Sequence, residues 1–156
     1  MNKDYCIQDN YPEQYCYCYG CGSKNQQGLQ IKSYRDGQRA TARFTPAEHH
    51  IALPGYVYGG LIASLVDCHG IATASAAVAE KEKDGEENHL NLKRYVTASL
   101  HVDYLRPTPM GEELEIISTA QTSNKRKVMV EVNIFAGGKL RARGQVVAAP
   151  MPQAMA

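Results

Sequence analysis

One segment, residues 59–79, constrains the fold more than any other, because it is apolar on nearly every side of the helix that it predicts. At 1.5 Å per residue such a helix is about 30 Å long. Polar residues interrupt it at Ser64, Asp67, His69 and Thr73, so it does not predict a transmembrane span. A helix of this kind is buried in a protein core, and the rest of the chain must therefore wrap it.

Two features of this helix indicate chemistry. Its start, Gly59-Gly60, exposes peptide N–H groups at the positive end of the helix dipole, where an anion or an oxyanion is stabilised. The alternative is that two small residues only allow a close backbone approach. Asp67 lies in the apolar interior, where an unpaired carboxylate is costly, and it is therefore a candidate functional residue. The alternative places Asp67 on a narrow exposed stripe with Ser64.

The remaining periodic segments alternate with a period of two and predict strands. Residues 29–35 and 38–44 flank Asp36-Gly37, a strong signal for a two-residue hairpin turn. Four further strands are predicted after the helix, at residues 95–104, 114–121, 127–136 and 139–148. The order of hairpin, helix and four-stranded meander predicts an α+β domain in which an antiparallel sheet packs on the helix.

The 156 residues divide into three predicted parts. Residues 1–28 form a leader, rich in tyrosine and cysteine, that packs on the domain. Residues 29–149 form the domain itself, and residues 150–156 form a loosely held tail. Residues 80–94 begin with a run of charges and are longer than a compact connection needs, so they are either a lid over a binding site or a surface insertion.

Bulk composition excludes several classes of function. The net charge of +1 offers no general attraction for nucleic acid or for an anionic membrane, so neither is expected as a partner. No apolar signal segment follows Met1, and we therefore expect a cytoplasmic protein. In that compartment its five cysteines are reduced thiols.

Three cysteines of the leader, Cys16, Cys18 and Cys21, raise the question of a zinc site. A structural zinc usually takes four ligands, often from two paired motifs. The only distant candidates are Cys6, Cys68 and the histidines, with no second paired motif. We therefore expect loop thiols without a metal.

A motif at the start of the predicted helix resembles a family signature. Tyr58-Gly59-Gly60, followed after six residues by Asp67, resembles the His-Gly-Gly…Asp signature of hotdog-fold acyl-CoA thioesterases, in particular the phenylacetyl-CoA-type group. Two further segments are similar to that family: Cys18-Tyr19-Gly20-Cys21-Gly22 with Asn25 and Gly28-Leu29, and Val96-Thr97-Ala98-Ser99-Leu100 with Asp103-Tyr104-Leu105-Arg106-Pro107. The resemblance spans roughly residues 18–148, and the family's His is Tyr58 here.

The resemblance implies a hotdog fold, which is an antiparallel sheet wrapped around one long central helix. It implies hydrolysis of an acyl-CoA to a free acid and CoA, with no cofactor because CoA is part of the substrate. It also implies a homodimer or a dimer of dimers. Gly59 and Asp67 are eight residues, or about 12 Å, apart along one helix, so one site can hold both only if two antiparallel helices supply them.

The resemblance implies catalytic roles for three residues and raises the question of a fourth, Tyr58. The Gly59 N–H binds the thioester oxygen, and Asp67 of the partner subunit acts as general base or as nucleophile. Thr97 matches a hydroxyl residue that orients the water or the carboxylate, although threonine is also an ordinary strand former. Tyr58 keeps a hydroxyl that either replaces the missing imidazole contact or fails to support turnover.

Substrate contacts are expected from Gly60 and Ser64 on the helix. His50, in the loop before the helix, is a further candidate, with an exposed loop histidine as the alternative. Basic residues near strand ends are candidates for the phosphates of CoA: Arg106, Lys125, Arg126 and Lys127. A basic cluster beside a turn is also typical of a plain soluble surface.

Two other functions compete with hydrolysis. Hotdog hydratases usually pair an Asp with a His slightly further along, but the residue five positions beyond Asp67 is Ala72, and His69 lies about 200° round the helix from Asp67. The other rival is a protein that binds acyl-CoA in the same groove without turnover, with Tyr58 as the reason.

Overall fold

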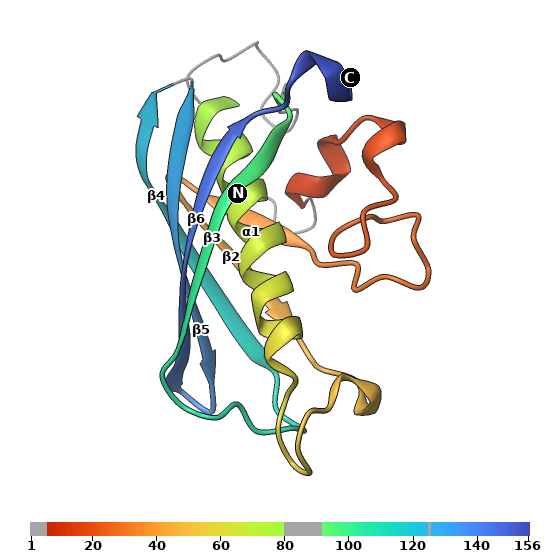
Figure 1. Ribbon diagram of the computed structural model, residues 1–156, viewed down its shortest axis with the longest axis vertical. Coiled ribbons are helices and arrows are strands. Elements are labelled where there is room, and N and C mark those ends of the chain that lie inside the picture. Colours follow the sequence, from red (N-terminus) through yellow and green to blue (C-terminus); the bar gives the residue numbers. More distant parts are fainter. Residues whose placement is uncertain (1–5, 80–91, 125) are drawn as a thin grey trace.

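The computed structural model describes residues 6–79, 92–124 and 126–156, and Figure 1 shows their arrangement. Its central element is the predicted helix, α1, which spans Gly59–Ala79. The carbonyl of Tyr58 accepts hydrogen bonds from the N–H groups of Leu61 and Ile62, which sets the first turn. By length and composition α1 could cross a membrane, but 78% of the apolar window is buried inside the domain, and this burial accounts for its composition.

Among the described residues, six antiparallel strands wrap this helix. Their bounds are β1 Ser33–Asp36, β2 Arg39–Phe44, β3 Tyr95–Tyr104, β4 Leu114–Asn124, β5 Lys127–Ala136 and β6 Lys139–Pro150. On β5 the predicted inner face, made of Val128, Val130, Val132 and Ile134, is completely buried. One long helix against one curved antiparallel sheet is the hotdog fold, so this expectation is confirmed (Figure 1).

The predicted four-stranded meander is wrong in one respect. The order in the sheet is β1-β2-β4-β5-β6-β3, so β3 lies at an edge beside β6, while β4 pairs with β2. The link from β3 to β4 does not form a tight turn because it is held at the start of α1. There the carbonyl of Thr108 accepts from the N–H of Val57, and Pro109 forms a bridge with Tyr56.

The first hairpin turns one residue later than predicted. Asp36 pairs with Arg39, so Gly37 and Gln38 form the turn, with Gly37 at a φ of 63°. Glycine at the first central position suits a hairpin turn that needs positive φ there. The first strand is also shorter than predicted, because residues 29–31 bond to the leader: the N–H groups of Leu29 and Ile31 donate to carbonyls of residues 19 and 20.

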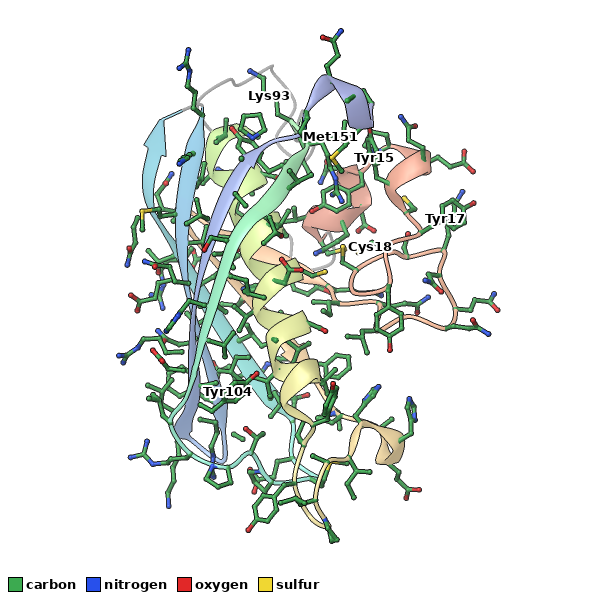
Figure 2. All side chains as sticks on the ribbon, viewed as in Figure 1. Tyr15, Tyr17, Cys18, Lys93, Tyr104 and Met151 are labelled. Atoms are coloured by element: carbon green, nitrogen blue, oxygen red, sulfur yellow. The ribbon has the colours of Figure 1, made fainter. Side chains whose placement is uncertain are left out.

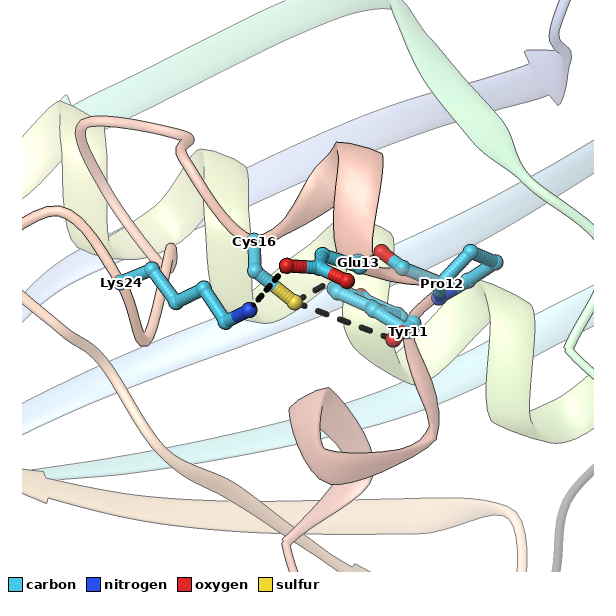
Figure 3. A network of polar contacts seen from close by, with 5 residues as sticks. All are labelled: Tyr11, Pro12, Glu13, Cys16 and Lys24. Carbon is cyan, nitrogen blue, oxygen red and sulfur yellow. Dashed lines mark hydrogen bonds and ion pairs between the residues drawn. The ribbon is translucent and has the colours of Figure 1, made fainter.

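The described part of the leader, residues 6–28, contains two short 3-10 helices, η1 Ile7–Asn10 and η2 Glu13–Tyr15, and lies beside α1 (Figure 1). Tyr11 is buried, whereas Tyr17 and Tyr19 are 57% and 59% exposed. Figure 3 shows a local polar cluster. In it, Lys24 pairs with Glu13 at 2.5 Å, and the Cys16 thiol donates to the carbonyls of residues 11 and 12. Most of the predicted lid or insertion, residues 80–91, lies outside the described residues.

Candidate functional site

The predicted site residues form two clusters, and the first lies at the start of α1. The N–H of Tyr58 donates to the carbonyl of His50 at 2.9 Å, which fixes the turn into the helix. The phenol of Tyr104, at the end of β3, donates to the carbonyl of Gly59 at 2.7 Å, and Figure 2 shows it at this end of the molecule. The first N–H groups of a helix have no intrahelical acceptor, so those of Gly59 and Gly60 remain able to bind an oxygen.

Only glycine fits at position 60, because the ring of Tyr58 lies close to its backbone. A Cβ atom on Gly60 would lie 2.3 Å from the ring of Tyr58, which therefore packs directly over this turn. Tyr58 is 57% exposed. Partial burial raises the pKa of Tyr104, and the nearby Tyr58 phenol raises it further. Two phenols, those of Tyr58 and Tyr104, thus flank the glycine pair. The sequence alone did not predict the contact of Tyr104, because this tyrosine is one of many residues in an alternating strand.

The second cluster lies at the middle of α1, where Asp67 is half-buried. The hydroxyl of Thr97 on β3 donates a hydrogen bond to Oδ1 of Asp67. The pairing of β3 with β6 shifts between Thr97 and Ser99, so a bulge lies at this contact. Bulges commonly re-aim a side chain beside an active site, and here the bulge adjoins the threonine that contacts the carboxylate.

A cavity of about 170 Å³ opens beside Asp67. Its lining residues are Cys18, Cys21, Asp67, Cys68, Ile71, Arg94, Tyr95, Val96 and Thr97. The guanidinium of Arg94 lies over the rings of Tyr11 and Tyr15, with its carbon 5.1 and 5.2 Å from their centres. The cavity therefore combines a carboxylate, a hydroxyl, thiols and one cation, and the leader closes it on one side.

Three of the lining residues are cysteines whose sulfur atoms lie within 4.8 Å of one another, namely Cys18, Cys21 and Cys68. Hydrogen bonds from the Cys21 and Cys68 thiols lower the pKa of Cys18, so a thiolate there is favoured. The hydrogen bond to Cys18 raises the pKa of Cys21 to about 12 and also raises that of Cys68. Sequence reasoning named Cys68 only as a distant candidate, since fifty positions separate it from Cys18.

The other predicted contact residues are dispersed. Ser64 turns back on its own helix and donates to the carbonyl of Gly60 at 2.8 Å. His50 accepts from the N–H of Ala47 through Nδ1 at 2.9 Å, and burial lowers its pKa, with His49 lowering it further. His50 thus supports the turn that carries Tyr58.

The two predicted arginines lie at opposite ends of the β5–β6 hairpin. Arg106 Nη1 donates to the carbonyl of Leu140 at 3.0 Å, beside the turn that joins β5 and β6. Arg126 lies just before β5 begins, at the other end. Ten residues of β5 span about 30 Å, so these arginines cannot bind the same phosphate of one chain's ligand. Lys127 begins β5, and Lys125 lies outside the described residues.

His69 belongs to a buried polar network and to neither of the two clusters. Its Nδ1 lies 2.8 Å from the hydroxyl of Ser33, and its Nε2 lies 2.9 Å from the hydroxyl of Ser118. The network continues to Gln8 and Thr73. Burial lowers the pKa of His69 to about 4, so the ring is neutral near pH 7. It ties the helix to the leader and the sheet.

Within one chain the two clusters of site residues are separate. Gly59 and Asp67 are eight residues apart on α1, or about 12 Å. The cavity beside Asp67 includes none of the residues at the helix start. Each chain therefore carries two half-sites, one with N–H donors and one with a carboxylate.

Known proteins resemble this chain in sequence and in fold. The family model described as thioesterase superfamily matches residues 54–142. A crystal structure of a thioesterase superfamily protein from Shewanella loihica is 43% identical, with 91% of this chain and 100% of that chain covered and a TM-score of 0.67. None of the curated protein sequences matches the chain.

Two more distant structures share the fold. The Escherichia coli PaaI protein of the phenylacetic acid degradation operon is 17% identical, with 80% of this chain and 81% of that one covered and a TM-score of 0.64. A Streptococcus mutans protein bound to acetyl-CoA is 15% identical, with 78% and 86% covered and a TM-score of 0.63. At these identities the likeness shows the fold alone.

Proposed function

Because this chain belongs to the thioesterase superfamily, we propose that it hydrolyses an acyl-CoA to a free acid and CoA. The observation that carries the proposal is the hydrogen bond from Thr97 to Asp67 beside a cavity, in a fold whose central helix also begins with Gly59-Gly60. A structural neighbour from Streptococcus mutans binds acetyl-CoA, which supports an acyl-CoA as the ligand here.

The active unit in this proposal is a homodimer. Residues 69–79 of α1 are buried within the chain, but Gly60, Ala63, Ser64 and Asp67 are only half-buried and recur at helical spacing along one stripe. Two copies that cross antiparallel at the middle of this stripe place Gly60 beside the partner subunit's Asp67. The small residues of the stripe permit close helix contact, so the dimer joins the two half-sites.

The chemistry then follows from the two half-sites. The N–H of Gly59, at the positive end of the helix, binds the thioester oxygen and stabilises its negative charge in the tetrahedral intermediate. Asp67 takes the proton of a water that attacks the thioester carbon, or attacks that carbon itself to form an anhydride, which water then hydrolyses to free the acid and restore the carboxylate. The C–S bond breaks, CoA leaves as the thiolate and takes up a proton, and the acid is released. Thr97 holds one carboxylate oxygen and leaves the other for this step.

A second candidate function is acyl-CoA binding without turnover. The specific observation in its favour is Tyr58, which occupies the position of the family's His. Its exposed ring packs over Gly60, so it shapes the ligand site in either case.

The test is hydrolysis of a panel of short, long and aromatic acyl-CoAs, with free CoA quantified by chromatography because the protein's own thiols would react with a thiol reagent. We expect turnover of at least one substrate, and a loss on the order of 10²- to 10⁴-fold in Asp67→Asn. Asp36→Asn, an exposed carboxylate at the β1–β2 turn, is the matched control and keeps the parent rate. A folded Asp67→Asn enzyme at the parent rate contradicts the proposal.

A further inference from the structure

The trio Cys18, Cys21 and Cys68 has the spacing of a metal-binding cluster. The sulfurs of Cys18 and Cys68 lie 3.8 Å apart, and all three lie within 4.8 Å of one another. Zinc bonds thiolate sulfur at about 2.3 Å in a tetrahedron, which places neighbouring sulfurs about 3.8 Å apart. The observed separation matches that edge and is far longer than a disulfide bond of about 2.05 Å.

The backbone of the leader is shaped around these sulfurs. A Cβ atom on Gly20 would lie 2.2 Å from the sulfur of Cys68, so only glycine admits this sulfur to the turn. A Cβ atom on Gly22 would lie 2.5 Å from the backbone nitrogen of Cys18. The N–H of Gly22 donates to the carbonyl of Cys18 at 2.8 Å, which closes the turn between the paired cysteines. The Cys-x-x-Cys spacing is that of paired zinc ligands.

The surroundings suit an anionic complex. Arg94 lines the same cavity and interacts electrostatically with Cys21. Two polar atoms nearby, Tyr11 Oη and Arg94 Nη1, are buried and have no hydrogen-bond partner among the described residues. The side chain of Tyr11 is only 9% exposed, and its phenol interacts electrostatically with all three cysteines. Three thiolates around one divalent cation carry one net negative charge, which a guanidinium and a phenol O–H can stabilise.

We propose that Cys18, Cys21 and Cys68 bind one Zn²⁺ ion through three thiolates, with the fourth ligand position open to the cavity that Asp67 lines. Each thiol releases its proton to solvent as its sulfur binds the metal. The ion joins the leader to α1 at the residue next to Asp67, and so holds the wall of the candidate site in place. This proposal departs from the sequence-based expectation of unliganded thiols, because the fold brings in Cys68 as a third ligand.

The first test is metal analysis of the full chain, purified without chelator and supplied with zinc. We expect one zinc per chain by mass spectrometry of the metal. Cys18→Ser, Cys21→Ser and Cys68→Ser each lower the bound zinc at least tenfold at matched free zinc. Cys16→Ser is the control, because Cys16 is also buried in the leader but its thiol donates to carbonyls of residues 11 and 12.

A second test needs no variant. Cobalt(II) added to the metal-free wild-type protein is expected to produce thiolate-to-cobalt charge-transfer bands and the visible bands of tetrahedral cobalt, both abolished by one equivalent of zinc. Folded wild-type protein that shows neither zinc nor these bands overturns the proposal. So does a Cys68→Ser protein that binds zinc as tightly as the parent, or a disulfide among the three cysteines that persists when reductant and zinc are supplied together.

Discussion

The hydroxyl of Thr97, on the edge strand β3, donates a hydrogen bond to Oδ1 of Asp67 in the middle of α1. Thirty positions separate the two residues, and the bulge in β3 lies at the point of contact. The bond occupies one oxygen of the carboxylate, so the other oxygen is available for a water or a thioester. The candidate base is therefore oriented by a strand that belongs to its own chain.

Replacing Thr97 by Val removes the donor but keeps the shape of the side chain. A hydrogen bond to a charged group contributes about 1.5–3 kcal/mol, so we expect kcat to fall by roughly 10- to 100-fold. The KM should change little, because Thr97 acts through Asp67. Steady-state kinetics measures both, and Thr97→Ser, which keeps the hydroxyl, should retain most of the rate. A Val variant at the parent kcat shows that Thr97 is an ordinary strand residue.

Tyr58 distinguishes an enzyme from a binding protein. In the account we prefer, its hydroxyl and its ring position the helix start, so Tyr58→Phe lowers acyl-CoA hydrolysis and Tyr58→His leaves it similar. In the competing account the imidazole is needed, and Tyr58→His raises hydrolysis from near zero. Kinetics on the same acyl-CoA panel, with binding measured by calorimetry, separates them. Tight binding without turnover in the parent, together with turnover in Tyr58→His, decides for the binding protein.

Local pattern predicted the elements well but not their neighbours. The bounds of α1 follow from a nearly unbroken apolar run, and the buried face of β5 follows from strict alternation, since both patterns report burial directly. The place of β3 at the sheet edge does not, because alternation says nothing about which strand pairs with which. The same limit applies to sites. Cys68 and Tyr104 reach their partners only through the tertiary fold, across 50 and 45 positions.

The free stripe of α1 predicts a dimer at micromolar concentration. Ala63 lies at its centre and is half-buried in the single chain, so Ala63→Arg should place two charges in the helix contact and produce a monomer. Sedimentation velocity measures the change in mass. Thr41→Arg, on the exposed face of β2, is the control and should stay dimeric. A parent protein that sediments as a stable monomer contradicts the dimer and the shared site together.

Stability should depend on pH through His69. Its folded pKa is about 4 and its unfolded pKa is about 6.5, so the unfolded chain binds more protons between these values. This contribution is complete above pH 6.5 and is lost as the pH falls toward 4. We expect it to lower the free energy of unfolding by about 2 kcal/mol between pH 7 and pH 5. Urea unfolding at both values should show a smaller decrease in His69→Gln, and equal decreases would refute the assignment.

In the proposed dimer, Gly59 of one subunit and Asp67 of the other form one site. Gly59→Pro removes the N–H donor at a helix position that tolerates proline, and Asp67→Asn removes the carboxylate. Each variant alone should be nearly inactive.

Co-expression of the two variants, followed by isolation of the mixed dimer, shows whether Gly59 and Asp67 act in one shared site. A mixed dimer contains one site with both defects and one intact site, so acyl-CoA hydrolysis should return to roughly half the parent rate per dimer. A verified mixed dimer that remains as inactive as the two single variants would show that Gly59 and Asp67 do not act together across the subunit interface.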